Sequence, residues 1–104
     1  MDMREMMERA REMQKKATDM QRQMAEMEIE GHSGGGLVRV VMGGNGVLKR
    51  VQIDPSLMNE GEREILEDLI VAAHGDAKTK LEQRMAKEMS QLAGQIGLPP
   101  GLAL

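Results

Sequence analysis

The chain has 104 residues, with 14 Lys and Arg against 17 Asp and Glu, and a formal net charge of −3 at pH 7. It contains no Cys, Phe, Tyr or Trp, but 12 Met and 12 Gly. This composition excludes disulfide scaffolds and cysteine zinc sites, and it disfavours proteins that stack single-stranded bases on aromatic rings. The length predicts one domain, residues 1–104.

Residues 1–26 predict a helix. Their small apolar residues recur at alternating spacings of three and four, which is the a/d pattern of a heptad repeat. So narrow an apolar stripe favours packing against another helix over packing against a broad core, although methionine-rich surfaces can also form adaptable binding grooves. The predicted seam of this helix consists of Met6, Met13, Met20 and Met24.

Residues 27–53 predict a three-stranded antiparallel sheet. The first strand is short, with Met27 and Ile29 facing one way, and a glycine-rich turn at 31–36 closes it. The second strand covers 37–42, is rich in β-branched residues and places Val38, Val40 and Met42 on one face.

Asn45-Gly46 predicts a hairpin turn with a positive φ angle. The third strand, 47–53, then places Val47, Val51 and Ile53 on one face. Neither glycine cluster has the spacing of a phosphate-binding loop or leads into a helix, so we interpret both as turns.

Residues 59–93 predict a long helix that begins at Asn59, a capping residue with Glu62 three positions later. Leu69, Leu81 and Met85 lie on its apolar stripe and complete the predicted seam, and a Gly/Pro tail follows at 94–104. Such a helix is about 45–50 Å long, whereas strands of seven residues span only ~23 Å. Both helices must therefore extend beyond the sheet, which predicts self-association as a two-fold homodimer.

Few residues suggest a catalytic or metal-binding site. The serines have no suitably spaced histidine and acid, and His32 and His74 lie far apart in sequence and offer no HExxH or similar ligand pair. We therefore expect no enzyme activity, cofactor, metal or small-molecule substrate.

The N-terminus has no apolar signal region, and the longest apolar run, 69–73, is far shorter than the ~20 residues of a membrane span. We expect a cytoplasmic protein without membrane contact.

Basic residues cluster twice, once on the outer face of the first helix and once in the second. Either cluster can be a solvated surface neutralised by nearby acids or a stripe that contacts phosphates, and a dimer would present each of them twice. The second cluster contains Lys78, Lys80, Arg84 and Lys87.

The sequence resembles the YbaB/EbfC family of bacterial nucleoid-associated proteins. The resemblance rests on GLVRV at 36–40, VQIDPSLM at 51–58, LEDLI at 66–70 and LPPG at 98–101, in family order. It implies an α+β, two-layer α-β-β-β-α fold and a tweezer-like homodimer that grips double-stranded DNA in the nucleoid with its helical arms. The arm residues that it implies as DNA contacts are Arg11, Lys15, Lys16, Lys78, Lys80 and Arg84.

We therefore expect a DNA-binding protein with little sequence specificity, since no base-reading motif is present. The alternative is a protein-interaction adaptor that uses its methionine-rich seams, with DNA contact incidental.

Overall fold

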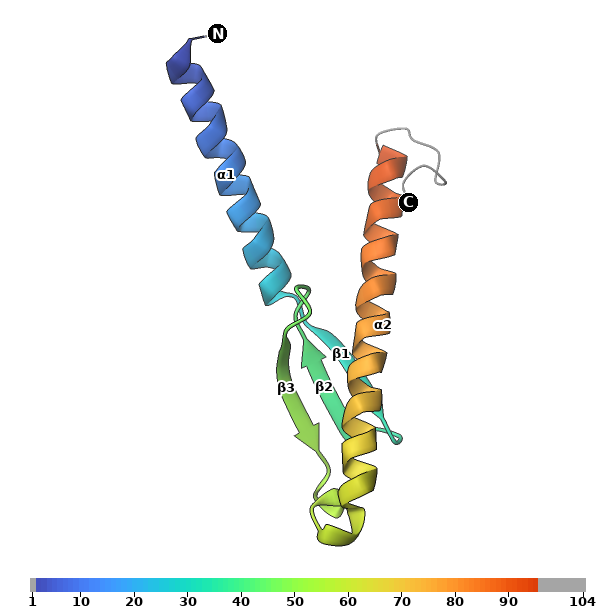
Figure 1. Ribbon diagram of the computed structural model, residues 1–104. Coiled ribbons are helices and arrows are strands. Elements are labelled where there is room, and N and C mark those ends of the chain that lie inside the picture. The colour runs from blue at the N-terminus through green and yellow to red at the C-terminus, as the bar shows by residue number, and fades with distance from the viewer. Residues whose placement is uncertain (1, 96–104) are drawn as a thin grey trace.

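The computed structural model describes residues 2–95. Its elements, in chain order, are α1 (Met3–Glu26), β1 (Ile29–Ser33), β2 (Val38–Met42), β3 (Leu48–Ile53), the short 3-10 turns η1 (Pro55–Leu57) and η2 (Glu60–Glu62), and α2 (Arg63–Gln95). Figure 1 shows a small sheet with α2 along one face and α1 projecting away from it. The predicted α-β-β-β-α order is confirmed.

The three strands form one antiparallel sheet in the order β1-β2-β3, so that β2 is central. α2 packs across β1 and β2. Val38, Val40 and Met42 project from β2 into this contact and are its largest fully buried side chains, as their alternation predicts. The opposite face carries the cross-strand ion pairs Arg39–Glu30 and Arg50–Glu28. The sheet is therefore buried on one side only.

β3 is covered less by α2 than β1 and β2 are (Figure 1). The register pairs Val51 with Val40, which places both on the same face of the sheet. Val51 nevertheless remains 40% exposed, whereas Val40 is fully buried. Leu48, opposite Met42, is also partly exposed. One chain thus leaves an apolar strip along β3 uncovered.

The first strand differs from its prediction. Met27 is the C-cap of α1, and β1 runs from Ile29 through Gly31 to Ser33, so half of the predicted glycine turn is strand. The reason is contact with α2. A Cβ atom at Gly31 would collide with the carbonyl oxygen of Ala73 and lie 2.5 Å from the backbone nitrogen of Ala77. Glycine here permits close packing of strand and helix.

The second helix also differs from its prediction. α2 begins at Arg63, not at Asn59, because residues 60–62 form the separate 3-10 turn η2, for which Asn59 is the N-cap. It continues to Gln95, two residues past the predicted end at 93. The rest of the predicted tail, residues 96–104, lies outside the described residues.

α1 is joined to the rest of the fold only near its C-terminal end. No residue of α1 is buried. The carbonyl oxygen of Met24 accepts a hydrogen bond from the backbone N–H of Gly44 in the β2–β3 loop, at 2.8 Å. A Cβ atom at Gly44 would lie 2.8 Å from that same oxygen, so only glycine lets the loop approach so closely. This contact holds the end of α1 at the turn after β2.

The molecule is elongated as a result. Its radius of gyration is 19.9 Å, against about 13 Å for a compact chain of 100 residues. Figure 1 shows α1 and the second half of α2 diverging as two arms from the sheet. The predicted extension of both helices beyond the sheet is confirmed.

Candidate nucleic-acid interface

The residues that the resemblance implies as DNA contacts do not form one patch. Arg11, Lys15 and Lys16 lie on α1, and the other three lie on α2. Successive helical residues are rotated by about 100°, so Lys78 and Lys80 project in directions about 160° apart. Lys78 lines a shallow apolar hollow with Met42 and Leu81, away from the others.

Lys80 is held against the sheet. Its Nζ lies 2.9 Å from Oδ2 of Asp76 and donates a hydrogen bond to the carbonyl oxygen of Glu30 at 3.3 Å. Oδ2 of Asp76 also accepts the backbone N–H of His32 at 3.0 Å. The hydrogen bond from His32, followed by that from Lys80, lowers the pKa of Asp76. Both bonded backbone groups belong to the outer edge of β1, so Lys80 and Asp76 fasten α2 to that edge.

Arg84 continues the helix face that covers the sheet. Ala73 and Ala77 are fully buried against the strands. Arg84 follows Ala77 by seven residues, which is about 20° short of two full turns. The same face therefore changes from small and apolar to basic once α2 has passed the sheet.

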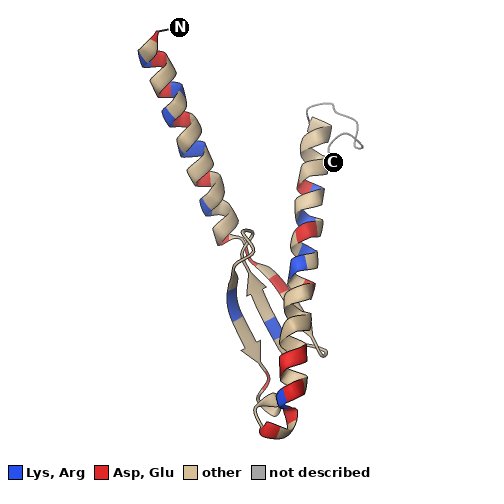
Figure 2. Cartoon of the chain, in the orientation of Figure 1, with Lys and Arg blue, Asp and Glu red and all other residues tan. Residues whose placement is uncertain are grey.

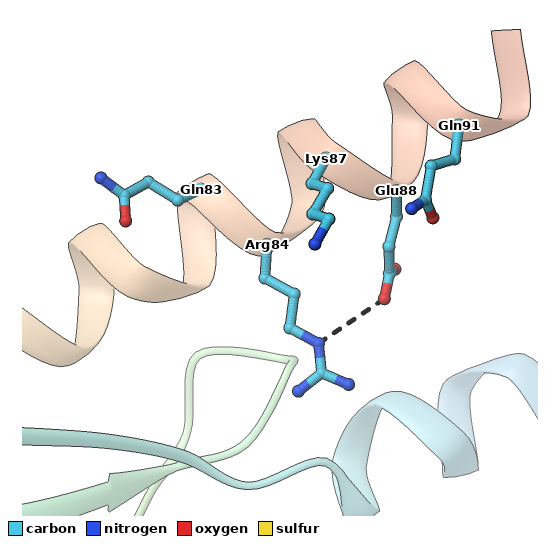
Figure 3. A pocket seen from close by; sticks show the side chains of 5 residues that line it. All are labelled: Gln83, Arg84, Lys87, Glu88 and Gln91. Atoms are coloured by element: carbon cyan, nitrogen blue, oxygen red, sulfur yellow. Dashed lines mark ion pairs between the residues drawn. The ribbon is translucent and has the colours of Figure 1, made fainter. Parts of the chain in front are cut away.

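Arg84 belongs to an open hollow of about 450 Å³ on the projecting part of α2, lined by Gln83, Arg84, Lys87, Glu88 and Gln91. Figure 3 shows Arg84 extending from α2 towards the β2–β3 loop, with Lys87, Glu88 and Gln91 on the same side of the helix and Gln83 directed elsewhere. Nε of Arg84 lies 3.6 Å from Oε1 of Glu88, and each side chain is 49% exposed. Exposed pairs of this kind are weak and open readily.

Lys87 shares this hollow with Arg84, although the resemblance does not imply it as a DNA contact. The sequence does place it in the basic cluster of the second helix. Lys87 follows Lys80 by seven residues, as Arg84 follows Ala77. This spacing places Lys87 on nearly the same side of α2 as Lys80, further along the arm.

Charge is partitioned along α2. Residues 63–76, which lie beside the sheet, contain one basic and four acidic side chains. Residues 77–95 contain four basic and two acidic side chains, but Lys78 and Lys80 still lie beside the sheet, and only Arg84 and Lys87 project beyond it. Figure 2 shows acidic residues gathered at the base of α2, and basic and acidic residues interspersed along the arm. The acidic total for residues 54–104 therefore comes from the residues before Ala77, while the residues beyond Lys80 carry equal numbers of basic and acidic side chains.

α1 carries its basic residues fully in solvent. Arg11, Lys15 and Lys16 are all exposed, and Figure 2 shows Lys and Arg interspersed with Asp and Glu along the helix. Arg11 borders a shallow groove with Arg4, Met7 and Glu8. In the sheet segment, Arg39 and Arg50 form similarly exposed pairs with Glu30 and Glu28.

The predicted seam divides into two groups. Met6, Met13 and Met20 are 57–72% exposed and Met24 is 37% exposed. Together with Met3 they form the α1 methionine stripe (Met3, Met6, Met13, Met20 and Met24). Leu69 and Leu81, by contrast, pack against the core of their own chain. Met85 is half-buried on the arm of α2.

Within residues 2–95, no cluster of three or more His, Asp or Glu side chains has the arrangement of a metal site. His32 and His74 are exposed and lie on different elements. No helix in the same part of the chain is both long enough and apolar enough to cross a membrane.

Two arms that carry basic residues thus project from a small sheet (Figure 1, Figure 2). The model of the YbaB/EbfC DNA-binding family matches residues 1–96. The chain belongs to this family.

Relatives match over most of the chain or nearly all of it. A nucleoid-associated protein of Brucella ovis is 52% identical over 103 residues, which cover 99% of this chain and 96% of the relative. A nucleoid-associated protein of Rhodopseudomonas palustris is 54% identical over 79 residues, covering 76% and 74% of the two chains. The crystal structure of an uncharacterized protein from Helicobacter pylori has a similar fold, with a TM-score of 0.64 at 24% identity, over 88% of this chain and 97% of that one.

Proposed function

We propose that this protein is a nucleoid-associated protein that binds double-stranded DNA as a homodimer in the cytoplasm, without enzymatic activity. Membership of the YbaB/EbfC DNA-binding family supports DNA as the partner. The observation that carries the proposal is that Arg84 and Lys87 line one hollow on the part of α2 that projects beyond the sheet (Figure 3).

The proposed contact is electrostatic. Arg84 and Lys87 from α2, with Arg11, Lys15 and Lys16 from α1, approach phosphates along the two arms. Lys78 contributes from the opposite side of α2, and Lys80 chiefly positions the helix. Contacts to phosphates position a protein on DNA without reading its sequence, so specificity is low. Such binding would organise the nucleoid or alter gene expression through occupancy of many sites.

The homodimer is supported by surfaces that one chain leaves uncovered. Isolated helices are marginally stable in water when tertiary contacts do not support them. α1 has 24 residues and buries none of them. Its methionine stripe, the exposed Met89 and Leu92 of α2 and the apolar strip of β3 offer the missing contacts. A second copy brings the same surfaces and doubles the number of basic arms.

The test is fluorescence anisotropy with labelled duplex DNA between about 50 and 200 mM salt, combined with sedimentation. We expect a dimer whose affinity for DNA falls steeply with salt. The double variant R84Q/K87Q should bind more weakly and with a smaller salt slope. R63Q is the matched control, because Arg63 is a basic residue at the base of α2, paired with Glu67 at 3.2 Å. A monomer at micromolar concentration contradicts the dimer, and absence of binding at low salt contradicts the function.

The adaptor remains the second candidate, favoured by the apolar surfaces that the arms expose. Purification from extract treated with nuclease distinguishes the two. A protein partner that remains in stoichiometric amounts after nuclease treatment, together with unaltered binding by R84Q/K87Q, supports the adaptor.

A further inference from the structure

An apolar hollow lies at the end of the molecule that is opposite to the arms. It has a volume of about 340 Å³, and we call it the basal hollow. Met58 at its edge is 66% exposed, whereas Leu57 is 4% exposed and belongs to the core. Figure 1 shows the segment 54–62 below the sheet, on the side away from both arms. The lining consists of Leu57, Met58, Asn59, Glu60, Arg63 and Leu66.

The turns that shape the basal hollow are fixed by short hydrogen bonds. The carboxylate of Asp54 accepts the backbone N–H of Ser56 at 2.9 Å. The side-chain amide of Asn59 donates to the carbonyl oxygen of Ser56 at 3.1 Å. Leu57, which lies between these bonds, packs into the core. The hollow is therefore formed in the free protein, and a ligand does not have to order it on binding.

Acidic side chains surround the basal hollow. Residues 54–68 contain six acidic side chains and one basic side chain, Arg63, which pairs with Glu67 at 3.2 Å. Figure 2 shows this concentration of acidic residues at the base of α2. The dipole of α2 favours acids in the first turn of the helix. It accounts neither for Glu67 and Asp68, which lie beyond that turn, nor for the exposed side chain of Met58.

We propose that the basal hollow binds a basic segment of another protein. The segment places a large apolar side chain in the hollow and lysine or arginine side chains over the surrounding acids. Exposed apolar patches with a polar rim mark sites of protein contact, and opposite charges steer and orient the partner. Nucleic acids and anionic membrane surfaces are repelled by the same acids. The charge of the rim therefore selects a cationic protein.

This site is separate from the surfaces that support the proposed homodimer. Those surfaces are the α1 methionine stripe, Met89 and Leu92 of α2 and the apolar strip of β3, and none of them lines the basal hollow. Two acidic basal hollows also repel each other, so they do not pair in a two-fold dimer. A dimer that holds DNA in its arms would thus present two free hollows at the far end. This last consequence rests on the proposed function, whereas binding at the hollow does not.

The test is the binding of a designed peptide to the full chain, measured by fluorescence anisotropy at about 0.15 M salt. The probe is a fluorescein-labelled peptide of about 14 residues, made of lysine and alanine with two leucines at positions i and i+4 of a helix. In the comparison peptide, serine replaces both leucines. We expect the comparison peptide to bind at least about tenfold more weakly. Equal binding of the two peptides would overturn the role of the apolar hollow.

Met58→Ser locates the apolar contact. It removes the exposed edge of the hollow and should weaken binding of the leucine peptide by about tenfold. Val71→Ser is the matched control, because Val71 is a 73% exposed apolar residue of α2 outside the hollow. Equal affinity of M58S and V71S for the peptide would overturn the assignment of the site.

The double variant E60Q/E64Q tests the acidic rim. Both residues are exposed, and their neutralisation should weaken binding of the leucine peptide by about threefold and make it less sensitive to salt. E8Q/E12Q is the control, because it neutralises two exposed acids of α1 and should bind the peptide like the wild type. Equal losses in both double variants would show that the peptide responds only to net charge, which would overturn the proposal.

Sedimentation and binding of duplex DNA by M58S complete the test. Both should equal those of the wild type, because Met58 lies away from the arms and from the surfaces offered for pairing. A change in oligomeric state would show that a second copy covers the basal hollow and would overturn the proposal. Absence of DNA binding by the wild type would contradict the proposed function alone, while the peptide series would still decide what the hollow binds.

Discussion

Asp76, in the middle of α2, accepts through its carboxylate a hydrogen bond from the backbone N–H of His32 at the free edge of β1, over 3.0 Å. One turn further along the helix, Lys80 donates to the carbonyl oxygen of Glu30 on the same edge. Two side chains of α2 thus satisfy backbone groups that have no neighbouring strand. They fix the helix along β1 and so set the direction in which its projecting half leaves the sheet.

The contact between Asp76 and His32 predicts a dependence of stability on acid. Because its hydrogen bonds lower the pKa of Asp76, its contribution to stability is present above the ordinary aspartate pKa of about 4 and is lost as the pH falls through the lowered value. D76N should be less stable than the wild type at pH 6 and should lose this part of the acid dependence. Urea unfolding at pH 6 and at about pH 3, at one protein concentration, measures both. D68N, at an exposed position of the same helix, should retain the acid dependence of the wild type.

Gly31→Ala should destabilise the fold. The new methyl group would collide with backbone atoms of Ala73 and Ala77, which cannot move aside as a flexible side chain could. We expect a loss of about 1–3 kcal/mol in the free energy of unfolding, measured by denaturant titration. Gly75→Ala is the control, because a Cβ atom there meets nothing within 4 Å and alanine is the better helix former. A G31A protein as stable as the wild type would contradict the close contact between β1 and α2.

Met42→Ala tests the small core. Met42 is 2% exposed among Val38, Val40 and the residues of α2. Removal of its side chain should lower the free energy of unfolding by about 2–5 kcal/mol. Val71→Ala, at a 73% exposed position on α2, should alter the same quantity by no more than about 0.5 kcal/mol. Similar losses in both variants would show that the core is not under this part of the helix.

Lys80 and Arg84 should separate stability from binding, although both are basic residues of one helix. K80Q removes the bond to β1 and should lower the thermal unfolding temperature, while the salt slope of DNA binding changes little. R84Q should leave thermal unfolding close to that of the wild type and reduce the salt slope by about 0.9 for each phosphate that the variant no longer neutralises. Thermal unfolding and salt-dependent anisotropy of the two variants supply the comparison. A smaller salt slope for K80Q together with a lower unfolding temperature for R84Q would show that the two residues have the opposite roles.

Much of the fold follows from local patterns in the sequence. The heptad of residues 3–24 and the alternation of Val38, Val40 and Met42 depend only on neighbouring residues, and α1 and β2 form where these patterns predict. The turn at Asn45-Gly46 is predictable for the same reason, and Gly46 has a φ angle of +83°.

The departures arise where distant residues decide the structure. Gly31 and Ser33 are typical turn residues, yet they lie in β1. Gly31 packs closely against α2, and the hydroxyl of Ser33 donates to the carbonyl oxygen of Leu69 at 2.6 Å. No pattern within residues 27–36 contains that information. The site shows the same limit, because the bond from Lys80 to Glu30 spans 50 residues of sequence.

One face of α2 is apolar at Ala77 and basic at Arg84. The number of residues between these two positions therefore determines the direction in which Arg84 points. Each residue inserted between them would rotate everything beyond it by about 100° and advance it by about 1.5 Å. A single insertion would therefore point Arg84 and Lys87 away from the side on which Figure 3 places them, with every basic residue still present. An insertion of seven residues would restore the orientation to within about 20° and lengthen the arm by about 10 Å. Insertions and deletions in the arm of α2 should therefore occur in steps of seven residues, which are close to two helical turns.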